Sequence, residues 1–262
     1  MNLTDLSVAS GFDFSKYSEP FVLRRVHARM LRLSMKEETD YLAYLRAHPE
    51  EKEKLHCELS IHVTHFFRDK AMYDVLMLES LFDLMKRKDI EGRRLIRIWS
   101  AGCSSGEEPY SVAIMAKELL GSRSDFHISI IGTDMDDDAL ELAGIGAYGE
   151  EQLKEADPDI IKKYFNLHEG RYYINDDIKK LVTFQKGDML TSSKPKQVDV
   201  IFCRNVVIYF SKEIKEKLYE DFYDCLLPGG ILILGKTETL TGNSREKFKV
   251  SNISERIYTK SL

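Results

Sequence analysis

Residues 94–111 read Arg-Leu-Ile-Arg-Ile-Trp-Ser-Ala-Gly-Cys-Ser-Ser-Gly-Glu-Glu-Pro-Tyr-Ser. The stretch opens with alternating apolar residues, continues with a run of small residues and ends in a segment with helical periodicity. This order predicts a strand, a glycine-containing turn and the first turns of a helix. Backbone N–H groups at the start of such a helix bind nucleotide-like ligands. By itself the stretch does not distinguish a dinucleotide, a phosphate or a nucleoside.

The composition of the 262-residue chain is that of a globular protein, with 43% hydrophobic and 31% charged residues. Its length allows one large domain, or a small domain joined to a medium one. The net charge of -5 argues against general nucleic-acid binding. No apolar run is long enough to span a bilayer, and the N-terminus lacks a signal-peptide pattern. The four scattered cysteines suit a reducing cytoplasm and give no reason to propose a metal site.

The N-terminal third carries helical signals, and no glycine stands between Gly11 and Gly92. Two prolines divide this part into several short helices. We expect a small helical domain with its linker at 1–88, followed by a second domain at 89–262.

Three arginines, Arg25, Arg29 and Arg32, follow one another along one side of the helix predicted after Pro20. One interpretation is a solvated surface beside the apolar face of that helix. The other is a docking face for an acidic partner, because basic residues outnumber acidic ones locally in a chain that is acidic overall. Both interpretations are open at this point.

Residues 60–69 read Ser-Ile-His-Val-Thr-His-Phe-Phe-Arg-Asp and are rich in aromatic and polar side chains. Taken alone, the two phenylalanines are interpreted as core residues. Arg68 would then cap a helix or pair with an acidic residue. A helix is expected after this run, from about residue 72 to 88.

From Arg94 onward, predicted strands alternate with predicted helices. Strands separated by helical crossovers imply a mostly parallel sheet with helices on both faces, an α/β fold. The expected strands cover 95–99, 127–132, 181–185, 198–203, 230–235 and 256–259. The expected helices cover 107–120, 136–144 and 211–226. The interval 150–184 interrupts the alternation and is interpreted as a small β insertion.

In such sheets ligands bind at the carboxyl ends of the strands. After the first strand, the small residues Ala101 and Gly102 let the backbone approach a ligand. Glu107 and Glu108 follow, and two carboxylates would repel a dinucleotide pyrophosphate but attract a cation. The loop also departs from the pattern GxGxxG, so an NAD-dependent dehydrogenase is disfavoured.

The second strand ends at Asp134, which is placed to accept hydrogen bonds from ribose hydroxyls. The alternative is that Asp134 caps the helix predicted at 136–144, and both can hold. The glycine loop and the acidic residues together favour a nucleoside with a positively charged centre, such as S-adenosylmethionine.

Two further strand ends carry candidate residues. Asp188 and Met189 could reach an adenine ring, or Asp188 could be a loop residue without a partner. Arg204 and Asn205 end the apolar strand predicted at 198–203. A polar pair at the end of a buried strand faces a cavity or caps the next element, and we favour the cavity.

These motifs together resemble the chemotaxis receptor methyltransferases, the CheR family. The resemblance rests on residues 99–111, 133–134, 201–210 and 227–230, and the run at 64–68 also matches. It covers nearly the whole chain. It implies a Rossmann-like, S-adenosylmethionine-dependent domain and a cytoplasmic protein-glutamate O-methyltransferase, which converts glutamates of membrane chemoreceptors into glutamyl methyl esters.

The resemblance also implies site residues. Arg68 and Tyr209 would lie near the transferred methyl group. The helical domain would cover the cofactor and present Arg25, Arg29 and Arg32 to the helical bundle of a receptor. The residues assigned to cofactor binding, including two of the glycine loop, are His62, Thr64, Arg68, Ala101, Gly102, Glu108, Asp134, Asp188, Met189, Arg204 and Asn205.

Three features depart from the family pattern. His62 and Asp188 stand where similar proteins have asparagine. The β insertion is short, and we therefore predict that the receptor's C-terminal peptide is not used as a tether. We also expect a monomer.

Two alternative functions remain open at this stage. The chain could methylate another protein or a small molecule. It could also be a non-catalytic module that binds S-adenosylmethionine or its demethylated product, S-adenosylhomocysteine, and interacts with receptors.

Overall fold

The computed structural model describes residues 1–59, 63–121 and 125–261. Two compact units are present. The first contains Met1–Ile61 with Val207–Lys217, and the second contains His62–Val206 with Leu218–Leu262. The division of the chain into 1–88 and 89–262 stays a prediction from the sequence.

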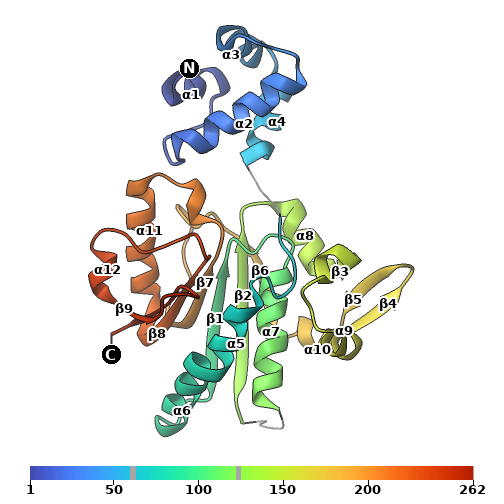
Figure 1. The fold of residues 1–262 in the computed structure, drawn as a ribbon, viewed down its shortest axis with the longest axis vertical. Coiled ribbons are helices and arrows are strands. Elements are labelled where there is room, and N and C mark those ends of the chain that lie inside the picture. The colour runs from blue at the N-terminus through green and yellow to red at the C-terminus, as the bar shows by residue number, and fades with distance from the viewer. Residues whose placement is uncertain (60–62, 122–124, 262) are drawn as a thin grey trace. The chain divides into compact units, whose positions relative to one another are not determined.

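The first unit is built on four helices (Figure 1). The apolar face of the second helix is buried through Val22, Val26 and Met30, with Pro20 in its first turn as expected for a helix start. The four helices are α1 (Leu3–Ser10), α2 (Glu19–Arg32), α3 (Glu38–Ala47) and α4 (Pro49–Leu59).

A distant part of the chain completes the first unit. The 3-10 turn η3 (Val207–Tyr209) packs here, and the Tyr209 carbonyl oxygen accepts a hydrogen bond of 2.8 Å from the Ser18 backbone N–H. The ring of Tyr209 lies 4.6 Å from that of Phe21. Tyr209 therefore belongs by packing to the helical unit, although it lies only six residues after the end of the sheet strand Val198–Cys203.

The second unit contains a seven-stranded sheet with the order β6-β2-β1-β7-β8-β10-β9. β10 is antiparallel to both of its neighbours, and the other pairs are parallel. All six expected strands are confirmed, and one edge strand is additional. The strands are β1 (Leu95–Ala101), β2 (His127–Asp134), β6 (Val182–Lys186), β7 (Val198–Cys203), β8 (Leu226–Leu234), β9 (Phe248–Asn252) and β10 (Ile257–Lys260).

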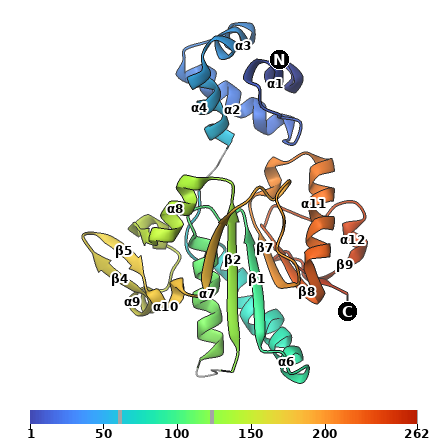
Figure 2. The ribbon, with the colours of Figure 1, turned by 180° about the vertical axis from the view of Figure 1, so that it is seen from behind.

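Helices cover both faces of this sheet (Figures 1 and 2). Alternating side chains of β1 show this directly, because Ile96 and Ile98 pack in the apolar cluster shared with α6 (Phe82–Ile90) and α7 (Glu107–Leu120). Trp99 points to the other face and packs edge-on against Phe222 of α11 (Lys212–Cys225), with 5.4 Å between ring centroids. The α/β architecture expected from the alternation is confirmed.

The expected helices at 107–120, 136–144 and 211–226 are confirmed, and the helix expected at 72–88 is present as a run that includes one π-helical segment. Among the residues described, no helix has the length and apolarity needed to cross a bilayer. The helices are α5 (Lys70–Val75), η1 (Leu76–Leu81), α6 (Phe82–Ile90), α7 (Glu107–Leu120), α8 (Asp137–Ile145), α11 (Lys212–Cys225) and α12 (Ser244–Lys247).

A separate three-stranded sheet, with the order β3-β5-β4, confirms the small β insertion. Its hairpin turns at Glu169 and Gly170, whose φ angles of 48° and 76° are those of a two-residue type I′ turn. The insertion contains β3 (Ala147–Tyr148), η2 (Glu150–Leu153), α9 (Pro158–Tyr164), β4 (Phe165–His168), β5 (Arg171–Ile174) and α10 (Asp176–Lys179).

Candidate active site

The glycine loop after β1 brings three strand ends together. Gly102 has a φ of 77°, and its N–H donates to the carbonyl oxygen of Thr133 at the end of β2, at 2.8 Å. A Cβ atom on Gly102 would lie 2.7 Å from a methyl group of Val206 and 3.2 Å from the terminal methyl group of Met189. Only glycine fits this position, beside the fully buried Ala101.

Helix α7 starts directly after this loop with two carboxylates, which the helix N-terminus stabilises. The two side chains have different surroundings. Glu107 is buried, and its oxygens accept hydrogen bonds of 2.9 and 3.0 Å from the Ser105 hydroxyl. Glu108 accepts a hydrogen bond of 2.7 Å from Ser100 and lies beside Arg204. Glu108 is therefore the carboxylate available at the strand ends.

Glu108 and Arg204 form an ion pair, with 3.5 Å between Oε2 and Nη1. Burial raises the pKa of Glu108 above its ordinary value, although Arg204 and the Ser100 hydroxyl act in the opposite direction. Within the part of the chain that the structure describes, Nε of Arg204 is buried without a hydrogen-bond partner. The desolvated carboxylate of Glu108 would be stabilised in its ionised form by a further cation.

Asp134 ends β2 and holds the glycine loop. Its Oδ2 atom accepts a hydrogen bond of 2.8 Å from the Ser104 N–H, and its Oδ1 atom accepts one of 3.1 Å from the Asp136 N–H. The cap of α8 is Asp136, whose side chain accepts from the Ala139 N–H. The alternative that Asp134 caps this helix is wrong, since the N-cap is Asp136 and the helix begins at Asp137.

In the loop after β6, Asp188 bonds within its own turn, whereas Met189 extends to the glycine loop. Asp188 accepts hydrogen bonds from the Leu190 N–H at 2.8 Å and from the Thr191 hydroxyl at 2.9 Å, so its carboxylate stabilises its own turn. The alternative of a loop residue without a partner is therefore wrong. Met189 extends to the glycine loop, against Gly102.

The end of β7 depends on a residue that the sequence analysis missed. Asn205 has a left-handed backbone, with a φ of 60°, and its N–H donates to Oε2 of Glu238 at 2.9 Å. The same oxygen accepts from the Gly235 N–H at 2.6 Å. Glu238 thus joins the ends of β7 and β8 from a buried position. Nothing in the local pattern around residue 238 indicates this role.

The loop before α5 contributes Thr64 and Arg68, both half-buried. The Arg68 guanidinium donates to the carbonyl oxygen of Val63 at 2.9 Å, and the Arg68 carbonyl oxygen accepts from Nη2 of Arg204 at 2.9 Å. Arg204 therefore connects this loop with Glu108 on α7. His62 lies outside the described residues.

Comparison with protein families identifies the family to which the chain belongs. Residues 62–257 match the family model "CheR methyltransferase, SAM binding domain", and residues 4–60 match "CheR methyltransferase, all-alpha domain". The chain belongs to the CheR methyltransferase family. It is a methyltransferase whose cofactor is S-adenosylmethionine and whose cofactor product is S-adenosylhomocysteine.

Curated relatives of the CheR family agree with this assignment. A chemotaxis protein methyltransferase of Listeria innocua is 33% identical over 230 residues, which cover 88% of this chain and 85% of the relative. Chemotaxis protein methyltransferase 2 of Vibrio cholerae is 34% identical over 238 residues, which cover 88% and 82% respectively. The resemblance found in the sequence is thereby confirmed.

The strand-end residues fit the cofactor of the CheR family. The sulfonium nucleoside carries an amino-acid end with an ammonium group, which suits the buried carboxylate of Glu108. Val206 and Met189 pack directly against the Cα atom of Gly102, so the glycine lets these two apolar side chains lie against the loop at the strand ends. The individual contacts of Asp134 and the other assigned residues with the cofactor stay predictions.

In the first unit of this chain, the three arginines of the predicted docking face have different partners. Arg29 makes a bidentate ion pair with the buried Glu51, at 2.7 and 2.8 Å. Arg32 pairs with Glu58 at the surface, and Arg25 stacks on an aromatic ring of its own helix. The charge of Arg29 is thus largely compensated within the unit. The docking role of the arginines stays a prediction, as does the position of Tyr209 near the methyl group.

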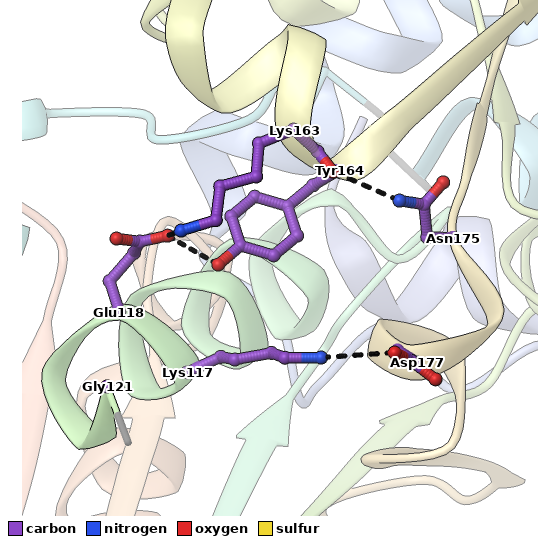
Figure 3. A pocket seen from close by; sticks show the side chains of 7 residues that line it. All are labelled: Lys117, Glu118, Gly121, Lys163, Tyr164, Asn175 and Asp177. Carbon is purple, nitrogen blue, oxygen red and sulfur yellow. Dashed lines mark hydrogen bonds and ion pairs between the residues drawn. The ribbon is translucent and has the colours of Figure 1, made fainter.

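A pocket of about 370 Å³ lies at the C-terminal end of α7, between this helix and the β insertion (Figure 3). At a rise of about 1.5 Å per residue, its Glu118 lies about 15 Å along the helix from Glu108. Its charges form pairs, Lys117 with Asp177 at 3.5 Å and Lys163 with Glu118 at 2.7 Å. This pocket is therefore distinct from the strand-end site. Its lining residues are Lys117, Glu118, Gly121, Lys163, Tyr164, Asn175 and Asp177.

Proposed function

We propose that the chain transfers the methyl group of S-adenosylmethionine to glutamate side chains of chemoreceptors, in the cytoplasm, and forms glutamyl methyl esters. One observation carries this proposal. Arg204 contacts both the carboxylate of Glu108 and the backbone of Arg68. A group suited to a cationic cofactor and a group suited to an anionic substrate are thus held by the same guanidinium. The family assignment supports the proposal.

The cofactor supplies, when bound, a methyl group on a positively charged sulfur atom. Glu108 would bind its ammonium group, and Asp134 would accept hydrogen bonds from its ribose hydroxyls. Asp188 and Met189 would lie at the adenine ring. His62, Thr64, Ala101, Gly102, Arg204 and Asn205 complete the proposed cofactor contacts.

The chemistry requires no general base. A glutamate side chain has a reference pKa of about 4.3, so the substrate is already ionised at neutral pH. The enzyme has to align the carboxylate oxygen with the methyl group and to exclude water, which stabilises the separated charges more than the charge-dispersed transition state.

Arg68 and Tyr209 take the positions beside the reacting groups in this proposal. Arg68 would orient the incoming carboxylate or close over the cofactor. A strong ion pair with the carboxylate would stabilise the ground state and slow the reaction, so we assign Arg68 an orienting role. Tyr209 would position the substrate or the methyl group through its hydroxyl.

The receptor's helical cytoplasmic bundle would dock on Arg25, Arg29 and Arg32 of the first unit. Arg29 is paired with the buried Glu51, so its charge would contribute least to docking. Arg32 is paired with Glu58 at the surface, and an exposed pair of this kind is weak enough for a receptor carboxylate to replace Glu58. We further propose that the enzyme acts as a monomer without the receptor's C-terminal peptide as a tether. Binding of a pentapeptide with the receptor's C-terminal sequence at low micromolar affinity would contradict the prediction that no tether is used.

The test is a methylation assay with radiolabelled S-adenosylmethionine and receptor cytoplasmic fragments. We expect label in the receptor that is released as methanol by mild base, as for a methyl ester, and that disappears when the target glutamates are replaced. Label in another protein or in a small molecule would favour a different substrate. Calorimetric binding of the cofactor and its product without any transfer would favour a non-catalytic module.

A further inference from the structure

The backbone on both sides of Arg68 is in an unusual conformation. Phe67 has a φ of 54° and Asp69 a φ of 62°, and both are left-handed without being glycine. Residues other than glycine rarely adopt the left-handed backbone region, and they keep it only where the surrounding structure holds them there. Two such residues flanking a predicted active-site arginine call for a physical cause.

On the C-terminal side of Arg68, the cause is Arg204. Its Nη2 atom donates to the carbonyl oxygen of Arg68 at 2.9 Å and to Oδ2 of Asp69 at 2.5 Å. The Arg204 side chain is only 2% exposed, so these are buried, charge-assisted hydrogen bonds. Asp69 therefore ties the loop to the end of β7.

A second carboxylate holds the loop from the β insertion. Oε2 of Glu155 accepts a hydrogen bond of 3.1 Å from the Asp69 N–H, and Oε1 lies 2.9 Å from Nε2 of His65. One side chain thus bridges residues on both sides of Arg68. Phe67 lies between these two anchored residues. Its N–H donates to the Ser111 hydroxyl at 2.9 Å, which fixes Phe67 to α7.

Phe66 anchors the same loop in the apolar core. Its side chain is fully buried, and its ring packs edge-on against Tyr148 at 4.8 Å and Phe165 at 5.1 Å. Its N–H donates to the carbonyl oxygen of Gln152. The Arg68 guanidinium, in contrast, reaches back only five residues, to Val63 at the surface. The backbone of the loop is thus held by distant parts of the unit, while its arginine side chain contacts its own loop.

We propose that Asp69 and Glu155 are positioning residues for Arg68. They hold the left-handed turn that directs the Arg68 guanidinium, and Asp69 does so through Arg204, the residue that also contacts Glu108. This inference rests on the proposed methyl transfer and assigns a role to two residues outside the predicted site.

The test compares Asp69→Asn and Glu155→Gln in the full chain, each nearly isosteric but without the charge. The matched controls are Asp177→Asn and Glu151→Gln, which remove exposed carboxylates that pair with lysines elsewhere in the same unit. We expect the variants to lower kcat for receptor methylation by about 10- to 100-fold, because a small misplacement of an orienting group has effects of this size. The Kd for S-adenosylmethionine should change less than about 3-fold, since Glu108 is unchanged and asparagine keeps an oxygen that can accept a hydrogen bond from Arg204.

A second readout does not depend on activity. Amide hydrogen exchange in a peptide covering residues 63–69 should become about 10-fold faster in both variants, because an acceptor or its charge is lost. Asp69→Glu should restore part of the activity if the charge is what Arg204 requires. The controls should match the wild type in both measurements.

The outcomes are distinguishable. Unchanged exchange, or unchanged kcat with an active wild type, would overturn the inference. A parallel loss of kcat, cofactor affinity and melting temperature would show a general structural role and would also overturn it. If the wild type fails to methylate receptor fragments, the proposed function fails, and the exchange measurement still tests whether the two carboxylates hold the loop.

Discussion

Oε2 of Glu108 lies 3.5 Å from Nη1 of Arg204, and the two side chains are 14% and 2% exposed. Ser100 donates to the other oxygen of Glu108 at 2.7 Å. Glu108 comes from the start of α7, the helix that follows β1, and Arg204 follows the end of β7. The ion pair therefore joins the segments that leave two neighbouring parallel strands.

Replacing Glu108 with glutamine should weaken cofactor binding. The amide side chain would keep an acceptor for Ser100 but lose the charge that binds an ammonium group. A hydrogen bond to a charged group contributes about 1.5–3 kcal/mol, so we expect a Kd for S-adenosylmethionine about 10- to 100-fold higher by calorimetry. The control is Glu118→Gln at the far end of the same helix, which should bind normally. Equal affinities in the two variants would refute the role of Glu108.

Cofactor affinity should fall as the pH is lowered. Burial raises the pKa of Glu108 in the free enzyme, so its carboxylate becomes protonated at a higher pH than an exposed glutamate does. The cation binds only the ionised form. Affinity is therefore full above this raised pKa and decreases as the pH falls through it. Calorimetry at a series of pH values should show this decrease in the wild type, and Glu108→Gln should show a weaker dependence.

Asp134→Ala should weaken cofactor binding more than it lowers the rate of transfer, because the ribose hydroxyls of the cofactor lose their hydrogen-bond acceptor. Asp138→Ala, an exposed residue of the following helix, is the control. The expected change is about 10-fold or more in Kd, with kcat at saturating cofactor much less affected. An unchanged Kd would eliminate the ribose assignment.

Arg68→Ala and Tyr209→Phe should have the reverse effect, lowering methyl transfer more than cofactor affinity. Both residues are expected to orient groups whose alignment matters in the transition state. Single-turnover rates with receptor fragments, measured together with calorimetric Kd values, separate the two effects. A rise in Kd with an unchanged rate at saturation would move both residues from catalysis to cofactor binding.

Arg29→Ala should destabilise the first unit. The variant would leave the buried carboxylate of Glu51 without its partner, and removing one member of a buried pair costs about 3–5 kcal/mol. Arg32→Ala at the surface should cost less than about 1 kcal/mol. Denaturant unfolding measures both. Similar stabilities would mean that the Arg29–Glu51 pair contributes little, and only then would Arg29→Ala be a clean test of receptor docking.

The elements of the sheet domain could be predicted because their signals are local. The expected helix at 107–120 coincides with α7, and the alternating apolar run before it became β1. The edge strand β9 was missed because only its first residue, Phe248, is buried, so it lacks alternation. Glu108 and Arg204 could be assigned to one site because parallel strands place their carboxyl ends on the same edge.

Partners at long sequence separation could not be predicted. Arg204 and Asp69 are 135 residues apart, Glu155 and Asp69 86, and Asn205 and Glu238 33. Periodicity and capping report on neighbours within a few residues, and they carry no information about which charges meet.

The sequence by itself determined the α/β class and the family of this protein, and it predicted a site at the strand ends, since these follow from local pattern and motif. Only the tertiary structure decided that Tyr209 packs with the helical unit, that Arg29 is neutralised by Glu51 and that Arg204 holds the loop of Arg68. The physical reason is that burial and ion pairing depend on which distant segments pack together, and that is a property of the folded chain.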